Sequence, residues 1–193
     1  MLYIVPGVLG FVIAFIFDLV SLKNMRVTKQ VAGLMAVALL IYSTIMICYS
    51  PTKFDMPIFL RIVGGVLLVI FLFLLIYSLF IELSFSRTYV KQGISGGLVT
   101  TGTYALVRHP GVIWLAVVFL ALALLYPSIT LFIAITVWWF VDIIYVTIQD
   151  KYLFPKMFPG YQEYKKQTPF LVPTKHSFFA CLKTLRPPSI QRP

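Results

Sequence analysis

The sequence predicts an all-α, polytopic integral membrane protein with about five transmembrane helices. Hydrophobic residues make up 60% of the 193 residues and charged residues only 11%. A soluble globular domain carries charged residues at about a quarter of its positions. Several apolar runs approach or exceed the roughly 20 residues that a helix needs to cross the hydrocarbon core of a bilayer.

Five apolar runs account for the predicted transmembrane helices. They cover residues 2–22, 31–49, 57–82, 112–125 and 129–148. The last two runs form a helical hairpin, because only Tyr126, Pro127 and Ser128 separate them. In the third run, Gly64 and Gly65 offer a surface on which a neighbouring helix can pack closely.

The distribution of basic residues predicts how these helices are oriented. The loop after the first run contains Lys23, Arg26 and Lys29 without an acidic residue, and residues 84–110 and 151–193 are also basic. Because Lys and Arg are in excess in cytoplasmic loops, we expect the N-terminus outside and these three segments in the cytoplasm. The net charge of +10 then reflects orientation and contact with membrane lipids, and nucleic acid is not an expected partner.

One face of the last apolar run carries polar side chains. Trp138, Asp142, Tyr145 and Gln149 follow i, i+4, i+7, i+11 spacing, so they project in one direction from a helix. A carboxylate at mid-span is costly in lipid and indicates a cavity or a partner. A structural hydrogen bond of Asp142 inside the bundle is an equally open explanation. Asp18, near the inner end of the first run, can reach interfacial water or a partner helix.

The most polar and turn-rich segment between two long apolar runs is residues 98–110, which ends in Arg108, His109 and Pro110. Pro110 restricts His109 to extended geometry and can open a new helix at its first position. Such a helix start presents free N–H groups and the positive end of a dipole, so a cofactor carboxylate or phosphate can bind there beside Arg108. The alternative is a basic loop that lies at the membrane surface.

Two motifs together point to a known family. The first is Leu-Val-Thr-Thr-Gly-Thr-Tyr at residues 98–104, followed by Val-Arg-His-Pro at 107–110. The second is Phe-Pro-Gly-Tyr-Gln-Glu-Tyr at 158–164, which closes with Thr-Pro-Phe-Leu-Val-Pro at 168–173. From about residue 84 to 173, the chain resembles the isoprenylcysteine carboxyl methyltransferase family and its phospholipid methyltransferase relatives. These polytopic enzymes methylate membrane-embedded substrates with S-adenosylmethionine.

The resemblance implies that S-adenosylmethionine binds in a cytoplasmic pocket covered by residues 84–110 and by the segment after the hairpin. The implied cofactor-binding residues are Gly97, Leu98, Val99, Tyr104, His109, Pro110 and Asp150. The first three would lie along the methionine and adenosine portions, and Asp150 would hold the ammonium. Arg108 would bind an anionic group of the acceptor or cofactor, so Arg108 and Asp150 are the predicted catalytic residues. No metal site is expected.

The chain departs from the family pattern at four positions, which are Val112, Trp114, Val146 and Lys151. The family often has Tyr at the position of Val112 and usually has Gly at the position of Trp114. Its prenylcysteine enzymes usually have an Arg at the position of Val146. At the position of Lys151 the family has a second acidic residue, which forms a pair with the one before it. Only Asp150 of that pair is present here. Methyl transfer is compatible with these changes, but they argue against prenylcysteine, so we expect a small or lipid-like acceptor embedded in the membrane.

The sequence divides into three parts. Residues 1–83 form an N-terminal three-span region, 84–173 a methyltransferase-like core and 174–193 a basic interfacial tail.

The sequence leaves two other functions open. One alternative function is an NADPH-dependent reductase of the sterol-reductase type, which carries a similar Arg-His segment. The other is a non-enzymatic relative that binds lipid.

Overall fold

The computed structural model describes residues 2–23, 25–83 and 97–185. Within these ranges the chain is helical, and its β structure is one isolated bridge between Lys53 and Ser128. The predicted all-α class is confirmed. Residues 84–96, which belong to the predicted basic loop and core, and residues 186–193 of the predicted tail lie outside the described residues.

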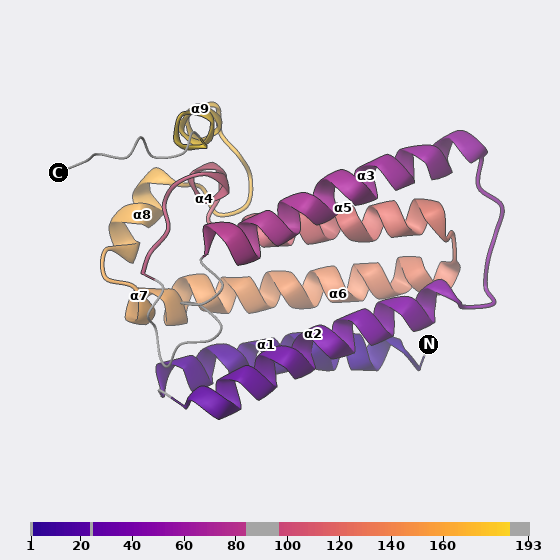
Figure 1. Cartoon of the computed structure of the whole chain (residues 1–193), viewed down its shortest axis with the longest axis horizontal. Helices are drawn as coiled ribbons and strands as arrows, with labels where there is room; N and C mark the ends of the chain where they lie inside the picture. The colour runs from indigo at the N-terminus through magenta and orange to yellow at the C-terminus, as the bar shows by residue number, and fades with distance from the viewer. Residues whose placement is uncertain (1, 24, 84–96, 186–193) are drawn as a thin grey trace.

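Five long apolar helices run along the same axis, each antiparallel to the next one in the chain (Figure 1). They are α1 (Ile4–Leu22), α2 (Arg26–Cys48), α3 (Ile58–Ile76), α5 (Pro110–Leu125) and α6 (Ile129–Ile148). Among the described residues, four helical segments of 19 to 29 residues are long and apolar enough to cross a membrane, and they contain α1, α2, α3 and α6. The 16-residue α5 is shorter than the others but equally apolar, and it lies beside α3 and α6.

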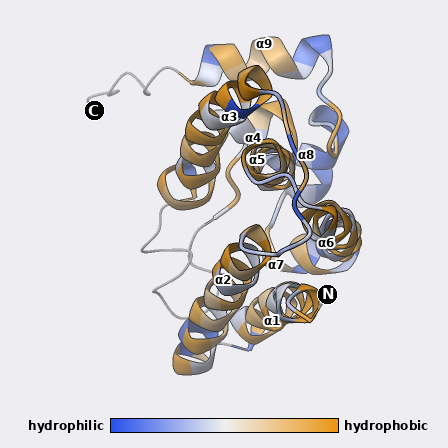
Figure 2. Cartoon of the chain, turned by 90° about the vertical axis from the view of Figure 1, so that its right-hand side faces the viewer, coloured by the Kyte–Doolittle hydropathy of each residue, from blue (hydrophilic) through white to orange (hydrophobic). Residues whose placement is uncertain are grey.

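The five helices form two close pairs that α6 connects (Figure 2). Helix α1 packs against α2, and α3 packs against α5. Gly64 explains the second pair, because a Cβ on this residue would lie only 2.9 Å from the carbonyl oxygen of Ala121 on α5. Gly65 has its nearest neighbour, Leu125, at 4.0 Å and does not set the helix separation. Small residues let helix backbones approach closely in membranes.

Three of the four residues that the spacing places on one face form hydrogen bonds with α1. The indole of Trp138 donates to the carbonyl of Ile4 at 3.0 Å. Both Tyr145 and Gln149 donate to one carboxylate oxygen of Asp18, each at 2.6 Å. Asp18 therefore reaches a partner helix rather than only interfacial water.

The polar elements gather at one end of the bundle, and the N-terminus lies at the other (Figure 1). This end contains α4 (Thr103–Leu106), α7 (Phe154–Met157), α8 (Tyr161–Gln167) and α9 (Lys175–Thr184). Helices α3 and α6 both end here as π-helices, η1 (Tyr77–Glu82) and η3 (Gln149–Leu153). Such π-helical turns are frequent at functional sites.

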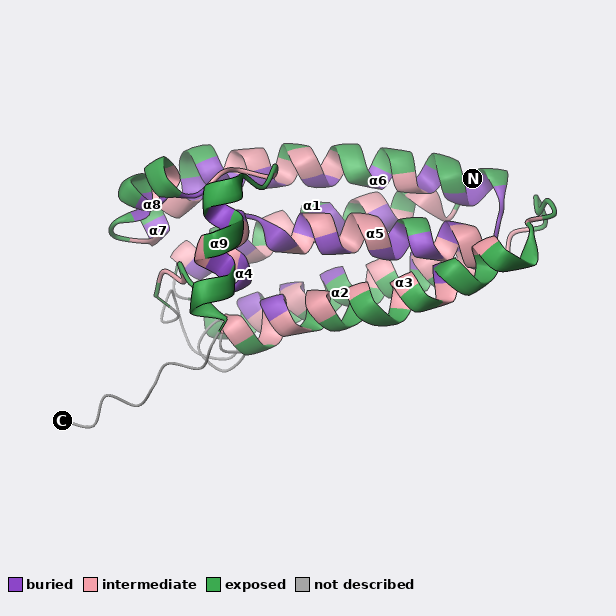
Figure 3. Cartoon of the chain, turned by 90° about the horizontal axis from the view of Figure 1, so that it is seen from above, coloured by how far each residue is buried: buried purple, intermediate pink, exposed green. Residues whose placement is uncertain are grey.

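Helix α9 lies across the end of the bundle, at a steep angle to the long helices (Figure 3). Phe178, Phe179 and Leu182 on α9 are exposed, whereas Cys181 is buried. Lys175 and Lys183 provide positive charge near its two ends. An exposed apolar face combined with basic residues is typical of a helix that lies in a membrane interface, and the interfacial role of this part of the tail stays a prediction.

Candidate active site

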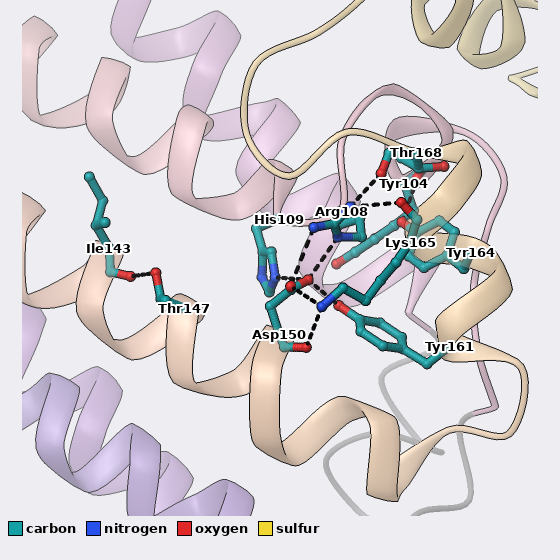
Figure 4. Close-up of polar contacts among 10 residues, drawn as sticks. All are labelled: Tyr104, Arg108, His109, Ile143, Thr147, Asp150, Tyr161, Tyr164, Lys165 and Thr168. Carbon is teal, nitrogen blue, oxygen red and sulfur yellow. Dashed lines mark hydrogen bonds and ion pairs between the residues drawn. The ribbon is translucent and has the colours of Figure 1, made fainter.

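Asp150 is the centre of a buried polar cluster at the end of α6 (Figure 4). Its carboxylate accepts the Nε–H of Arg108 at 2.7 Å and lies 2.8 Å from the ammonium of Lys165 on α8. The hydroxyl of Tyr161 donates to the same carboxylate at 2.8 Å. The two predicted catalytic residues, Arg108 and Asp150, therefore form an ion pair with each other.

Arg108 joins the two segments that carry the sequence motifs. Its Nη1 donates to the carbonyls of Thr168 and Lys165, at 2.6 and 3.2 Å. Its backbone N–H donates to the carbonyl of Pro169 at 2.9 Å. The planar guanidinium can make these bonds together with the bond to Asp150, because its five donors form a fixed fork. The segment before α5 and the segment after α8 are thus held together, although the hairpin separates them in the sequence.

His109 is the N-cap residue of α5, and its Nε2 has no hydrogen bond among the described residues. Pro110 is the first residue of the helix, so the predicted helix start is present. The imidazole stacks on Phe154, with 5.6 Å between ring centroids, and meets the edge of Phe170 at 5.2 Å. Its Nε2 is 3.6 Å from a carboxylate oxygen of Asp150 and has no hydrogen bond among the described residues. Burial lowers the pKa of His109, against the opposing effect of Asp150, so the ring is largely neutral at pH 7.

Tyr164 connects this cluster to Tyr104. Its hydroxyl donates to the carbonyl of Tyr104 at 2.6 Å, and its ring lies 5.8 Å from that of Tyr161. Burial raises the pKa of Tyr164, the charge of Arg108 lowers it, and the charges of Asp150 and Glu82 raise it further. Tyr164 therefore lies within electrostatic reach of two carboxylates and stays a neutral donor.

Glu82 is a site residue that the sequence reasoning did not single out. It ends η1, and its carboxylate accepts the backbone N–H of Thr103 at 2.9 Å and also the hydroxyl of Thr103. Gly102 has φ of +61°, and a Cβ there would collide with the carboxylate of Glu82. Both the backbone conformation and the contact require glycine at this position. The available signal was an acidic residue at the boundary of an otherwise apolar run.

The structure does not join all predicted cofactor residues to the cluster. Gly97, Leu98 and Val99 lie in the segment that leads to α4, and no hydrogen bond or ion pair among the described residues connects them to Asp150. Lys151, at the lost acidic position, is exposed. The cofactor roles of these residues stay predictions.

The sequence matches the profile of a known protein family. The profile of one family, described as phospholipid methyltransferase, matches residues 60–159, more than half of the 193 residues. The chain belongs to the phospholipid methyltransferase family. The predicted family is thereby confirmed, and together with the apolar helices it makes the chain an integral membrane protein of a methyltransferase family. No curated protein and no solved structure matches the chain.

The matched region includes some elements of the site and excludes others. It covers Glu82, Arg108, His109 and Asp150. It ends before α8, which supplies Lys165 and the two tyrosines, and it excludes the α1–α2 pair.

Proposed function

We propose that this protein transfers a methyl group from S-adenosylmethionine to a lipid-like acceptor at the cytoplasmic face of the membrane. Membership of the phospholipid methyltransferase family supports the reaction class. The observation that carries the proposal is that the Arg108 segment and the Tyr161 segment, on either side of the hairpin, meet at Asp150. The two motifs thus contribute to one site.

The chemistry of the site fits such a donor. S-adenosylmethionine carries a carboxylate, an ammonium and a sulfonium, and when bound it supplies an electrophilic methyl group. His109 offers a buried ring nitrogen without a hydrogen-bond partner among the described residues. A buried polar atom of this kind is costly unless a ligand or water pairs with it. Glu82 offers a partly exposed carboxylate beside Tyr104, one of the predicted cofactor residues.

The residues of the Asp150 cluster would act mainly by fixing geometry. Arg108 and Asp150 use most of their donors and acceptors on each other and on α8. They would hold the segments around donor and acceptor and keep water out. Correct alignment of two reactants can contribute roughly 7–11 kcal/mol to lowering a barrier. An in-line methyl transfer needs this alignment more than it needs a proton carrier.

The need for a base depends on the acceptor. A carboxylate or thiolate acceptor has no proton to lose, whereas an amine or hydroxyl acceptor must lose one. His109 is the candidate base, because it is buried, largely neutral at pH 7 and has Nε2 free among the described residues.

The surroundings favour a lipid-like acceptor that is reached from the cytoplasm. The site lies at the end of five apolar helices, together with the basic turn between α1 and α2 (Figure 1). The excess of Lys and Arg at this end supports a cytoplasmic orientation. Trp114, where the family usually has glycine, packs on Phe71 of α3 with ring centroids 5.7 Å apart and fills space between α3 and α5. Val146, at the position where prenylcysteine enzymes usually have an Arg, argues against prenylcysteine as the acceptor.

The test is binding followed by turnover in lipid nanodiscs. Calorimetric titration with S-adenosylmethionine and, separately, with NADPH separates the three functions that the sequence left open. Binding of S-adenosylmethionine alone, with transfer of its radiolabelled methyl group into a membrane lipid extract, supports the proposal. Binding of NADPH alone would identify a reductase, and binding of neither would identify a non-enzymatic protein.

A further inference from the structure

We infer that Glu82 is the carboxylate that binds a cationic group of the methyl donor. This inference rests on the proposed function. It assigns to Glu82 the part that the resemblance gives to Asp150. The two carboxylates differ in the charge of their partners.

Asp150 has little capacity left for a ligand cation. A carboxylate offers about four lone-pair positions. Arg108, Lys165 and Tyr161 occupy the two oxygens, at distances of 2.7 to 2.8 Å. Two of these partners are already cations, so a third positive charge would meet a site whose negative charge is balanced.

Among the residues that the structure describes, the partners of Glu82 are neutral. Both of its hydrogen bonds come from Thr103, one from the backbone and one from the hydroxyl. No Lys, Arg or His among the described residues forms an ion pair with it. About half of its lone-pair positions are therefore open, and the side chain is only partly buried. A ligand cation can reach this carboxylate, and none of the cationic side chains in residues 2–23, 25–83 and 97–185 is paired with it.

The other acidic residues do not compete for this part. The sequence contains six Asp and Glu, and all lie in the described ranges. Asp18 and Asp142 are buried along α1 and α6, and Asp55 lies between α2 and α3 at the opposite end of the bundle. Glu163 is exposed and paired with Lys166 at 2.7 Å.

The position of Glu82 connects it to the predicted cofactor segment. Its carboxylate touches Gly102 and Thr103, directly before Tyr104. The backbone N–H of Gly102 donates to the hydroxyl of Thr184 on α9 at 2.9 Å, so α9 covers this side. The hydroxyl of Tyr164 donates to the carbonyl of Tyr104 at 2.6 Å, so the same segment also contacts the Asp150 cluster. A cation at Glu82 would lie beside the segment that leads into Tyr104.

The test is the isosteric variant Glu82→Gln in the full chain in nanodiscs. The amide oxygen can still accept the N–H of Thr103, so α4 keeps this bond while the charge is lost. We expect the affinity for S-adenosylmethionine to fall about tenfold or more, as for a lost bond to a charged group. Titration with S-adenosylhomocysteine, which lacks the sulfonium but keeps the ammonium, identifies the group. An equal loss for both ligands assigns the ammonium, and a loss for S-adenosylmethionine alone assigns the sulfonium.

Two controls separate charge from structure. Glu163→Gln removes a carboxylate at the same end of the bundle but outside the site, and its donor affinity should equal that of the wild type. Thr103→Val removes one partner of Glu82 but keeps the charge. Its main effect should therefore be a lower melting temperature, with a smaller effect on the affinity for the donor.

Two results would overturn the inference. One is wild-type affinity for both ligands in Glu82→Gln. The other is an equal loss of affinity in Thr103→Val and Glu82→Gln with equal loss of thermal stability, because Glu82 would then only cap α4. If the wild type itself binds no S-adenosylmethionine, the proposed function fails, and that outcome is distinct from both.

Discussion

Two adjacent residues at the end of α6 belong to two different polar clusters. Gln149 donates to Asp18, together with Tyr145, and the charge of the buried Lys29 on α2 also acts on this carboxylate. Asp150 is paired with Arg108 and Lys165, which are cations. The Asp18 contacts hold α1 on α6 within the bundle, whereas the ion pairs of Asp150 hold together the segments around the proposed reaction site.

The largest expected effect comes from Asp150→Ala. Removing the carboxylate leaves Arg108, which is mostly buried, and Lys165 close together without a counter-charge. Breaking a buried pair by removing one partner typically costs about 3–5 kcal/mol. We expect a large fall in the melting temperature in detergent and loss of donor binding in titration. A melting temperature within a degree or two of wild type would contradict the charge-balance argument.

A matched pair of tyrosine variants tests whether the Asp18 and Asp150 clusters have different roles. Tyr161→Phe removes a 2.8 Å hydrogen bond to Asp150, and Tyr145→Phe removes a 2.6 Å hydrogen bond to Asp18. Loss of a hydrogen bond to a charged group costs about 1.5–3 kcal/mol, so both variants should be destabilised to a similar extent. Only Tyr161→Phe should also lower methyl-transfer activity at temperatures where both are folded. Equal loss of activity in the two variants would mean that the Asp18 cluster also serves the reaction.

The helices of this protein were more predictable than its site. Apolar runs fix the helices because lipid requires that backbone polar groups pair within each segment. The spacing on α6 also predicted that Trp138, Tyr145 and Gln149 share one face, since helical periodicity is local; that this face meets α1 was not predicted. The pairing of Lys165 with Asp150 could not be read from the sequence, because it depends on how α8 folds back over the end of α6. Glu82 was missed because its role depends on the backbone of Gly102 and Thr103, which are distant in the sequence.

His109 provides a smaller, pH-dependent effect that is confined to the Asp150 cluster. Burial lowers its pKa in the folded state, so the unfolded chain binds the proton more tightly. The contribution to stability is therefore present above the unfolded pKa of about 6.5 and is lost as pH falls through that value towards the folded pKa. Melting temperatures measured from pH 8 to pH 5 should fall more for wild type than for His109→Gln. Parallel curves for the two proteins would show that His109 does not titrate differently on folding.

The smallest effect is expected from Asp142→Asn, eight residues before Asp150 on the same helical stretch. Asp142 is buried, and none of the described residues forms a hydrogen bond or ion pair with it. A carboxyl group without partners contributes no bond that the amide would lose, so stability should change by about 0.5 kcal/mol or less, as at positions without a specific interaction. Methyl transfer should be unchanged as well. A clear loss of stability would reveal a partner for Asp142 inside the bundle, whereas a loss of turnover at normal stability would extend the reaction site to mid-span.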